Sequence, residues 1–193
     1  ILNCLNLVIA KGARVGFVGS TGSGKSTTLD LLMGLLIPTE GKLLVDGQHV
    51  SGNRLTAWQR SIAHVPQNIY LADTTLAENI AFGVPAENID MERVQQAAHQ
   101  AQIADFIERS PKGYNAYVGE RGVRLSGGQC QRIGIARALY KQASVLVLDE
   151  ATSALDNATE QSVMDAIGGL NRDLTILLIA HRLTTVQHCD FIV

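Results

Sequence analysis

Apolar residues dominate three short segments of the chain. Residues 15–18, 145–148 and 176–179 are almost continuously apolar instead of alternating between apolar and polar positions. A strand with this pattern is buried on both of its faces, as in a parallel sheet that is covered by helices. The chain is therefore predicted to be an α/β protein whose parallel sheet is covered by helices.

Helical periodicity fills much of the sequence between these segments. Residues 128–141 and 158–168 read as helices, and the stretch from about Asn79 to Leu125 reads as mostly helical without a strong buried strand. One helical face is marked by apolar residues at i, i+3, i+7 and i+10, namely Met91, Val94, Ala98 and Ala101. We expect a helical subdomain inserted into the α/β core.

The length of 193 residues indicates one domain, or one domain with a subdomain. The net charge of −2 (16 basic minus 18 acidic residues) gives no electrostatic reason to expect a nucleic-acid partner. No apolar run reaches the roughly 18–20 residues that cross a bilayer, and no signal peptide is visible. The three cysteines lack metal-ligand spacing and are interpreted as reduced thiols, which suits a cytosolic compartment: Cys4, Cys130 and Cys189.

A glycine-rich loop at residues 19–27 carries the most specific chemistry. It matches the phosphate-binding pattern G-x-x-x-x-G-K-[ST], with residues 12–19 predicted as the strand before it and residues 27–36 as the helix after it. Its glycines let backbone N–H groups approach a polyphosphate, Lys25 supplies a positive charge, and the Ser26 hydroxyl can bind Mg²⁺. The predicted nucleotide contacts are Gly19, Ser20, Thr21, Gly22, Ser23, Gly24, Lys25, Ser26 and Thr27.

Two carboxylates follow the second apolar segment. Asp149 and Glu150 stand at the predicted carboxyl end of a buried strand, where ligands bind in open parallel sheets. Asp149 is placed to hold Mg²⁺ directly or through water. Glu150 is then available to polarise an attacking water as a general base.

A pair of glycines lies at the start of the helix predicted over residues 128–141. Ser126 is placed as the N-cap of this helix, and Gly127 and Gly128 leave backbone N–H groups exposed at its start. The chain therefore carries two candidate cradles for the γ-phosphate of a nucleotide. A head-to-tail dimer, in which the loop of one chain faces the glycine pair of the other, would let one nucleotide use both.

The chain resembles the nucleotide-binding domain of ATP-binding cassette (ABC) transporters over essentially all of its 193 residues. The motifs described above occur in the same order as in that family. The loop at 19–27 is similar to the Walker A motif, residues 145–150 to Walker B, and residues 125–129 to the signature motif. The resemblance implies a P-loop NTPase fold with a RecA-like parallel sheet, an inserted α-helical signature subdomain, and a remnant antiparallel β subdomain. From the sequence pattern itself, residues 41–47 are predicted to be a strand that ends in an Asp-Gly turn. The resemblance places the core at about 1–78 and 142–193 and the helical subdomain at about 79–141 of a single domain, 1–193.

The resemblance also implies roles for further residues, with ATP and Mg²⁺ as cofactors. Gln67 matches the Q-loop glutamine that contacts Mg²⁺ together with Ser26 and Asp149, and His181 matches the switch histidine at the γ-phosphate. With Lys25 and Glu150, Gln67 and His181 form the expected catalytic set. Residues 153–156 match the D-loop. The nucleotide contacts expected from the signature motif and D-loop are Ser126, Gly127, Gly128, Gln129 and Asp156.

Two segments are similar to the exporter branch of the family. They are residues 73–83, after the Q-loop, and residues 118–122, which resemble the exporter X-loop and contain Glu120. This implies an ATPase at the cytoplasmic face of the membrane that powers export through a membrane domain fused to its N-terminus. The expected partners are ATP, a second nucleotide-binding domain and that membrane domain.

The chain departs from the family pattern at three places. The family has an adenine-stacking aromatic residue well upstream of Walker A, whereas only 18 residues precede Gly19 here. The family's terminal strands and helices after Val193 are also missing, so the sequence is interpreted as part of a longer polypeptide. Cys130 stands where the family usually has a basic residue.

Two other functions stay open at this point. A soluble ABC ATPase of the DNA-repair type needs a long coiled coil, but the 57 residues between Gln67 and Leu125 show no sustained heptads; a ribosome-associated type needs a second cassette. A non-hydrolysing nucleotide-binding regulator is opposed by the intact Lys25 and Glu150. The transported substrate and the choice between homodimer and heterodimer are not indicated by the sequence, although two intact half-sites favour a homodimer.

Overall fold

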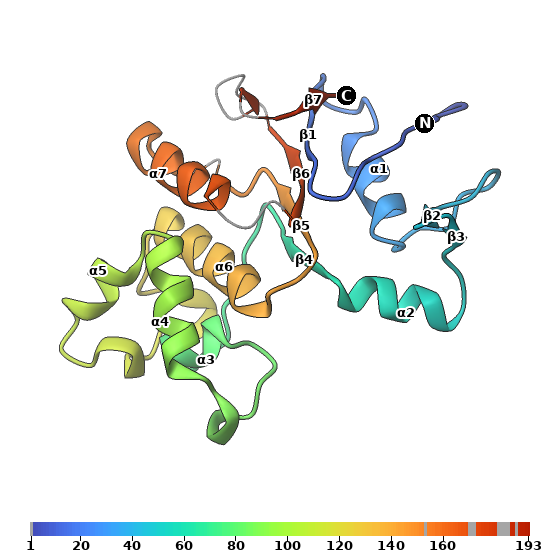
Figure 1. The fold of residues 1–193 in the computed structure, drawn as a ribbon. Helices are drawn as coiled ribbons and strands as arrows, with labels where there is room; N and C mark the ends of the chain where they lie inside the picture. Colours follow the sequence, from blue (N-terminus) through green and yellow to red (C-terminus); the bar gives the residue numbers. More distant parts are fainter. Residues whose placement is uncertain (1, 153, 170–172, 181–185, 188) are drawn as a thin grey trace. The chain divides into compact units, whose positions relative to one another are not determined.

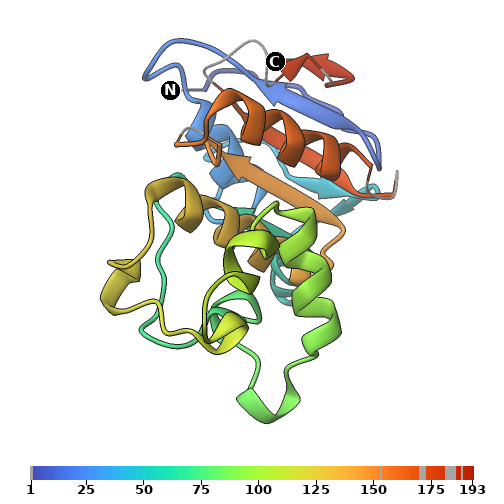
Figure 2. The ribbon, with the colours of Figure 1, turned by 90° about the vertical axis from the view of Figure 1, so that its left-hand side faces the viewer.

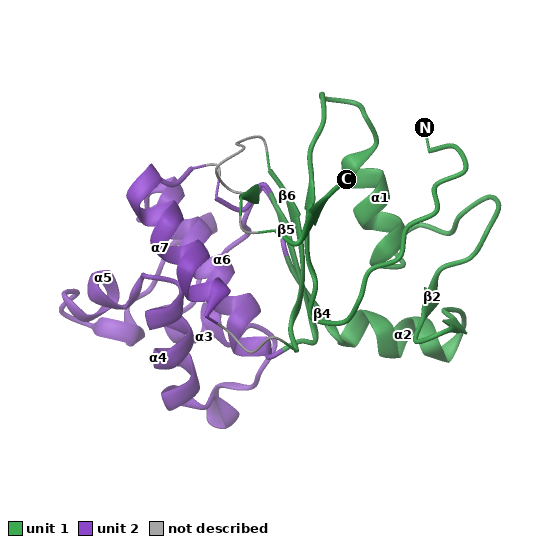
Figure 3. Cartoon of the chain, turned by 45° about the horizontal axis from the view of Figure 1, so that its top comes forward, with its two compact units in different colours: residues 1–64, 143–149, 171–193 green, residues 65–142, 150–170 purple. Residues whose placement is uncertain are grey.

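The computed structural model describes residues 2–152, 154–169, 173–180, 186–187 and 189–193. The chain divides into two compact units, which Figure 3 distinguishes by colour. Unit 1 contains residues 1–64, 143–149 and 171–193, and unit 2 contains residues 65–142 and 150–170. Each unit is built from segments that are far apart in the sequence.

Unit 1 is organised around a five-stranded sheet with the order β4-β5-β6-β1-β7 (Figure 1). The pairs β1–β6, β5–β6 and β1–β7 are parallel, and Leu177 on β6 is in register with Val15 on one side and Val147 on the other. The three predicted apolar segments are therefore confirmed as the central strands of a parallel sheet. The strands are β1 (Arg14–Phe17), β4 (Ile62–Val65), β5 (Val145–Asp149), β6 (Thr175–Ile179) and β7 (Phe191–Ile192).

Helix α1 (Lys25–Leu32) packs on this sheet through Leu29 and Met33, which belong to the same apolar cluster as the inward side chains of the strands. The predicted helix over residues 27–36 is wrong at its C-terminal end. Gly34 adopts a left-handed φ of +68°, and the N–H groups of Leu35 and Leu36 donate to the Asp30 carbonyl at 2.8 and 3.2 Å. This C-terminal capping pattern ends the helix four residues early.

Helix α2 (Asn53–Arg60) and strand β4 were not predicted from the sequence pattern. Helix α2 is tied to the C-terminal end of α1, because the Trp58 indole Nε1–H donates to the Leu32 carbonyl at 2.7 Å. The predicted Asp-Gly turn is confirmed: Asp46 and Gly47 have φ values of +49° and +73° between β2 (Leu44–Val45) and β3 (Gln48–His49), which pair antiparallel. Two positive φ values are typical of a tight hairpin turn.

Unit 2 is mainly helical in its described part. Helices α3, α4 and α6 pack against one another around fully buried aliphatic side chains that include Ile80, Ile107 and Ile133 (Figures 1 and 2). Short 3₁₀ helices at Ala86–Asn88, Gly113–Asn115 and Glu120–Gly122 connect the longer elements. The α-helices are α3 (Leu76–Ile80), α4 (Met91–Gln100), α5 (Ala104–Glu108), α6 (Gly127–Lys141) and α7 (Asn157–Gly168).

The predicted apolar face of α4 needs one correction. Met91 is 40% exposed, whereas the buried face consists of Val94, Ala97, Ala98 and Ala101. These positions follow the i, i+3, i+4, i+7 spacing of a helix that packs on one side only. None of the described helices is both long enough and apolar enough to cross a membrane.

Candidate nucleotide-binding site

The loop between β1 and α1 has a backbone that requires glycine. Gly22 and Gly24 have φ values of +82° and +96°, which L-amino acids with a side chain rarely adopt. At Gly19 the φ is +154°, and a Cβ atom would lie only 2.8 Å from the Ser23 hydroxyl oxygen. The loop can therefore fold closely around a ligand only with glycine at these positions.

Lys25 is folded back over this loop. Its Nζ donates hydrogen bonds to the carbonyls of Gly19 and Ser20 at 2.9 and 3.0 Å. Helix α1 begins at Lys25, its N-cap Gly24 supplies no side-chain hydrogen bond, and its first turn contains no acidic residue. The ammonium group and the positive end of the helix together form a site suited to an anion.

The oxygen donors of unit 1 fit a hard divalent cation such as Mg²⁺. Ser26 presents an exposed hydroxyl in the first turn of α1, and Asp149 ends β5 with a half-buried carboxylate. Mg²⁺ is usually bound by one or two carboxylates together with hydroxyl, water and phosphate oxygens. The residue types are therefore compatible with the cation that the sequence predicts.

His64 on β4 belongs to the same electrostatic environment as Asp149. Although the residue has solvent-accessible surface, burial of its ring lowers the pKa of the imidazole, while the carboxylates of Asp149 and Asp30 act in the opposite direction. Because burial is the larger influence, the ring favours its neutral form at neutral pH. His64 therefore adds little positive charge that would compete with a cation for Asp149.

In unit 2, Glu150 adopts an unusual backbone conformation immediately after β5. Its φ is +51°, a left-handed value that costs a residue with a side chain roughly 1–2 kcal/mol. The Gln67 side chain donates from Nε2 to Glu150 Oε2 at 2.8 Å, so these two predicted site residues are in direct contact. Strained backbone of this kind is concentrated at functional sites, where the surrounding structure holds a side chain in a required position.

The glycine pair at residues 127–128 begins α6, as predicted, and Ser126 is confirmed as its N-cap. The Ser126 hydroxyl accepts from the Gln129 N–H at 3.3 Å, and Gln129 Oε1 accepts from the Ser126 N–H at 2.8 Å. These reciprocal bonds form a capping box. A Cβ atom at Gly128 would lie 3.2 Å from the Ala154 carbonyl, so the absence of a side chain allows the close approach of residues 154–155.

Asp156 caps α7 through its side chain. The backbone N–H and the hydroxyl of Thr159 donate to the carboxylate at 3.0 and 2.7 Å, and these bonds hold the pKa of Asp156 below its usual range. Ser153 and His181, which the sequence assigns to the D-loop and the switch, lie outside the described residues.

Sequence reasoning missed two side chains that hold unit 2 together. Gln131 is buried, and its Oε1 accepts from the Ala154 N–H at 2.9 Å, which links the signature helix to the D-loop segment. Arg137 donates to the carbonyls of Asn79 and Tyr70 at 2.8 and 3.0 Å and lies 4.5 Å from the centre of the Phe82 ring. The sequence did contain a signal for these roles, because Gln131 and Arg137 are polar residues in a helix whose other face is apolar.

Cys130 follows the signature motif directly and is a free thiol. Burial raises the pKa of the Cys130 thiol, which keeps the group in its neutral form. The position therefore adds no charge to the start of α6, in contrast to the basic residue expected from the family pattern.

A glycine-rich loop between a buried parallel strand and an uncapped helix, together with an acidic residue at the end of another such strand, defines the P-loop class of nucleotide-binding proteins. The sequence profile of the family described as "ABC transporter" matches residues 2–153. The chain belongs to the ABC transporter family, as the sequence motifs predicted.

Similar sequences include a bacterial flippase and a mouse protein of the ATP-binding cassette sub-family B. The chain is 46% identical over its whole length to an ATP-dependent lipid A-core flippase of Cupriavidus metallidurans and covers 32% of that protein. It is also 45% identical over its whole length to ATP-binding cassette sub-family B member 5 of Mus musculus, of which it covers 15%. The chain thus spans about a third of the length of the bacterial relative.

A solved structure shares the fold. A bacterial Atm1-family ABC exporter with ATP bound matches 94% of the chain with a TM-score of 0.88 and 43% sequence identity, and the chain covers 32% of that protein. The predicted fold class is therefore confirmed: a parallel sheet core with helices and a small antiparallel sheet.

Proposed function

We propose that this chain is the Mg²⁺-dependent ATP-hydrolysing domain of an ABC exporter. The rest of the relatives' length supports a membrane domain as its partner, fused on the N-terminal side, with the ATPase at the cytoplasmic face of the membrane. We further propose a single ABC ATPase domain with its core at about 1–78 and 142–193 and its helical subdomain at about 79–141. The cargo is chosen outside this chain, since a flippase and a mouse transporter are equally similar to it.

Binding of ATP is assigned to the loop at residues 19–27. The N–H groups at the start of α1 and the Lys25 ammonium are the donors for the β- and γ-phosphates. The Lys25 ammonium, now bound to loop carbonyls, would exchange these weak acceptors for charged phosphate oxygens. Ser26, Asp149 and Gln67 would hold Mg²⁺, which neutralises phosphate charge during transfer.

Hydrolysis is assigned to Glu150, and the contact of Gln67 with Glu150 is the observation that carries the proposal. An amide that donates to one carboxylate oxygen helps to fix the direction of the carboxylate that is assigned to accept a proton from water. The left-handed backbone of Glu150 further restricts where this carboxylate lies. We assign His181 the role of a donor to the γ-phosphate.

The site is proposed to be completed by a second nucleotide-binding domain. Ser126 and Gly127 are exposed, and the first turn of α6 presents backbone N–H groups beside them. The signature residues 126–129 and Asp156 of one copy would then contact the nucleotide bound to the loop of the other, in a head-to-tail dimer.

The test of hydrolysis is Glu150→Gln in the full-length protein that contains this chain. Loss of the general base should reduce ATP turnover by roughly 10²–10⁴-fold while ATP affinity is kept. Glu92→Gln, an exposed position on α4, is the matched control and should leave turnover unchanged. Turnover near the wild-type rate in Glu150→Gln would refute the assignment.

The test of the dimer is a disulfide crosslink between Ser20→Cys and Ser126→Cys. The three free cysteines at positions 4, 130 and 189 are first replaced by serine, so that only the introduced thiols react. Nucleotide should increase the yield of crosslinked dimer. Crosslinks that form only within one chain would contradict the head-to-tail arrangement.

A further inference from the structure

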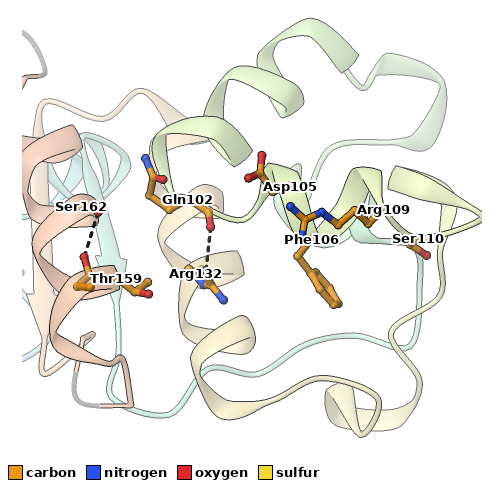
Figure 4. Close-up of a pocket in the computed structure, with 9 residues that line it drawn as sticks. Gln102, Asp105, Phe106, Arg109, Ser110, Arg132, Thr159 and Ser162 are labelled. Atoms are coloured by element: carbon orange, nitrogen blue, oxygen red, sulfur yellow. Dashed lines mark hydrogen bonds between the residues drawn. The ribbon is translucent and has the colours of Figure 1, made fainter.

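Unit 2 contains a cavity of about 710 Å³ that none of the proposed ATP-binding residues lines. It is open to solvent and is bordered by the turn after α4, by α5 and by one face each of α6 and α7 (Figure 4). Small-molecule sites in proteins commonly occupy about 300–1,000 Å³. The cavity is therefore large enough to hold a metabolite.

Two guanidinium groups give the cavity an anion-binding character. Arg132 reaches it from α6 and donates from Nη1 to the Gln102 carbonyl at 2.9 Å and from Nε to the Gly128 carbonyl at 3.4 Å, which fixes the plane of its guanidinium group. Arg109 comes from the end of α5, and its side chain has no hydrogen bond or ion pair to any described residue. Asp105 is the one carboxylate in the lining, so the lining has a net charge of +1 (two Arg minus one Asp).

The polar groups contributed by α7 are hydrogen-bond acceptors. The Ser162 hydroxyl donates its proton to the Ala158 carbonyl at 3.0 Å, and the Thr159 hydroxyl donates to the Asp156 carboxylate at 2.7 Å. Each hydroxyl oxygen can therefore only accept a bond from a ligand. Together with the Asp105 carboxylate, they call for a ligand that carries hydroxyl or amino donors besides its anionic group.

The remaining recognition element is the ring of Phe106, which is half-buried and lines the cavity beside Arg109 (Figure 4). A flat apolar face beside guanidinium groups suits a planar ring that is attached to an anion. We propose that this cavity binds a small phosphate monoester that also carries hydroxyl groups and a planar ring, as a nucleoside monophosphate does. The phosphate contacts Arg109 and Arg132, the hydroxyl groups donate to the α7 oxygens, and the ring packs on Phe106.

The test uses uridine 5′-monophosphate as the probe and the full-length protein that contains this chain. The ATP site is first saturated with a non-hydrolysable ATP analogue, and binding of the probe is then measured by isothermal titration calorimetry. Uridine, which lacks the phosphate, should bind at least roughly tenfold more weakly, because it loses charge-assisted hydrogen bonds. Inorganic phosphate, which lacks the ring and the hydroxyl groups, should also bind more weakly.

Two variants address the cavity and a third serves as a control. Arg109→Ala should weaken binding of the monophosphate roughly 10–100-fold, and Ala158→Phe should weaken it by filling the cavity from α7. Lys112→Ala removes an exposed positive charge three residues away, outside the lining, and should leave affinity unchanged. Retained affinity for the ATP analogue in every variant shows that the protein is folded.

Three results would overturn the proposal. They are no binding of the monophosphate at millimolar concentration, equal affinity for uridine and its monophosphate, and unchanged affinity in Arg109→Ala. None of them depends on ATP hydrolysis, so failure of this proposal is distinguishable from failure of the proposed ATPase function.

Discussion

Helices α1 and α6 both begin beside glycines, but their first turns are completed in different ways. The N-cap of α1 is Gly24 with a left-handed φ of +96° and no side-chain hydrogen bond. The N-cap of α6 is Ser126 with extended backbone, and the capping box with Gln129 satisfies N–H groups of its first turn.

The start of α1 is therefore suited to bind an anion, whereas the N–H groups at the start of α6 are partly satisfied within the chain. The start of α1 relies on a left-handed backbone that glycine adopts and on Lys25, and the N–H groups of its first turn gain partners when a phosphate binds. The start of α6 is stable without a ligand and still presents Gly127 at the surface. On this comparison, the loop should depend on nucleotide for its stability, whereas the signature turn should not.

Among substitutions at the two helix starts, the largest effect is expected from Lys25→Ala. Removal of the one cation of the loop should lower ATP turnover by roughly 10²–10³-fold, since a donor to developing phosphoryl charge is lost. Steady-state phosphate release from the full-length protein measures this. Lys11→Ala is the control, because Lys11 forms an exposed ion pair with Asp173 at 3.0 Å and its removal should have little effect. Wild-type turnover in Lys25→Ala would contradict the role assigned to the loop in ATP hydrolysis.

Replacement of glycine by alanine should affect stability differently at the two helix starts. Gly22→Ala introduces a Cβ into open space but at a φ of +82°, so it should cost roughly 1–2 kcal/mol of unfolding free energy. Gly127→Ala adds a methyl group at a helical position, 3.6 Å from the Ala154 Cβ, and should leave stability unchanged or slightly higher. Urea denaturation measures both. Equal losses would mean that backbone strain does not distinguish the two turns.

A smaller effect is expected from removal of the α6 cap. Ser126→Ala should lower the unfolding free energy by about 1 kcal/mol, because the Gln129 N–H loses its acceptor. Ser126→Gly should cost only a few tenths of a kcal/mol. If the alanine variant is as stable as the wild type in the same denaturation experiment, the capping box does not stabilise the helix.

The smallest effect concerns α7, whose start is capped by a carboxylate. The bonds from Thr159 hold the pKa of Asp156 below its usual range, so the folded state prefers the ionised form. This contribution to stability is present above the usual aspartate pKa and is lost as the pH falls through the lowered value. Asp156→Asn keeps a good cap and should flatten the acid limb of the stability curve, measured by denaturation between neutral and acidic pH. An unchanged acid limb would assign the pH dependence to other groups.

The central strands and the helix starts could be predicted because their signals are local. Val145–Leu148 is apolar without a break, and Ser126 precedes two glycines and a glutamine at the capping-box spacing. Strand β4 was missed because Ile62–Val65 is short and contains His64, so it becomes a strand only by pairing with β5. The end of α1 was missed because apolar residues continue through Leu36, and the left-handed Gly34 overrides them.

In the candidate site, too, features with local sequence signals could be predicted and features that depend on tertiary contacts could not. The order and spacing of the motifs determined the family, since the phosphate-binding loop, the acidic strand end and the signature turn each require particular residue types at fixed local spacing. Only the tertiary structure decided that Gln67 bonds to Glu150, that Gln131 holds the D-loop segment, and that α5, α6 and α7 border a cationic cavity. These contacts join residues that are distant along the chain, and their distances are set by the packing of the helices and strands between them.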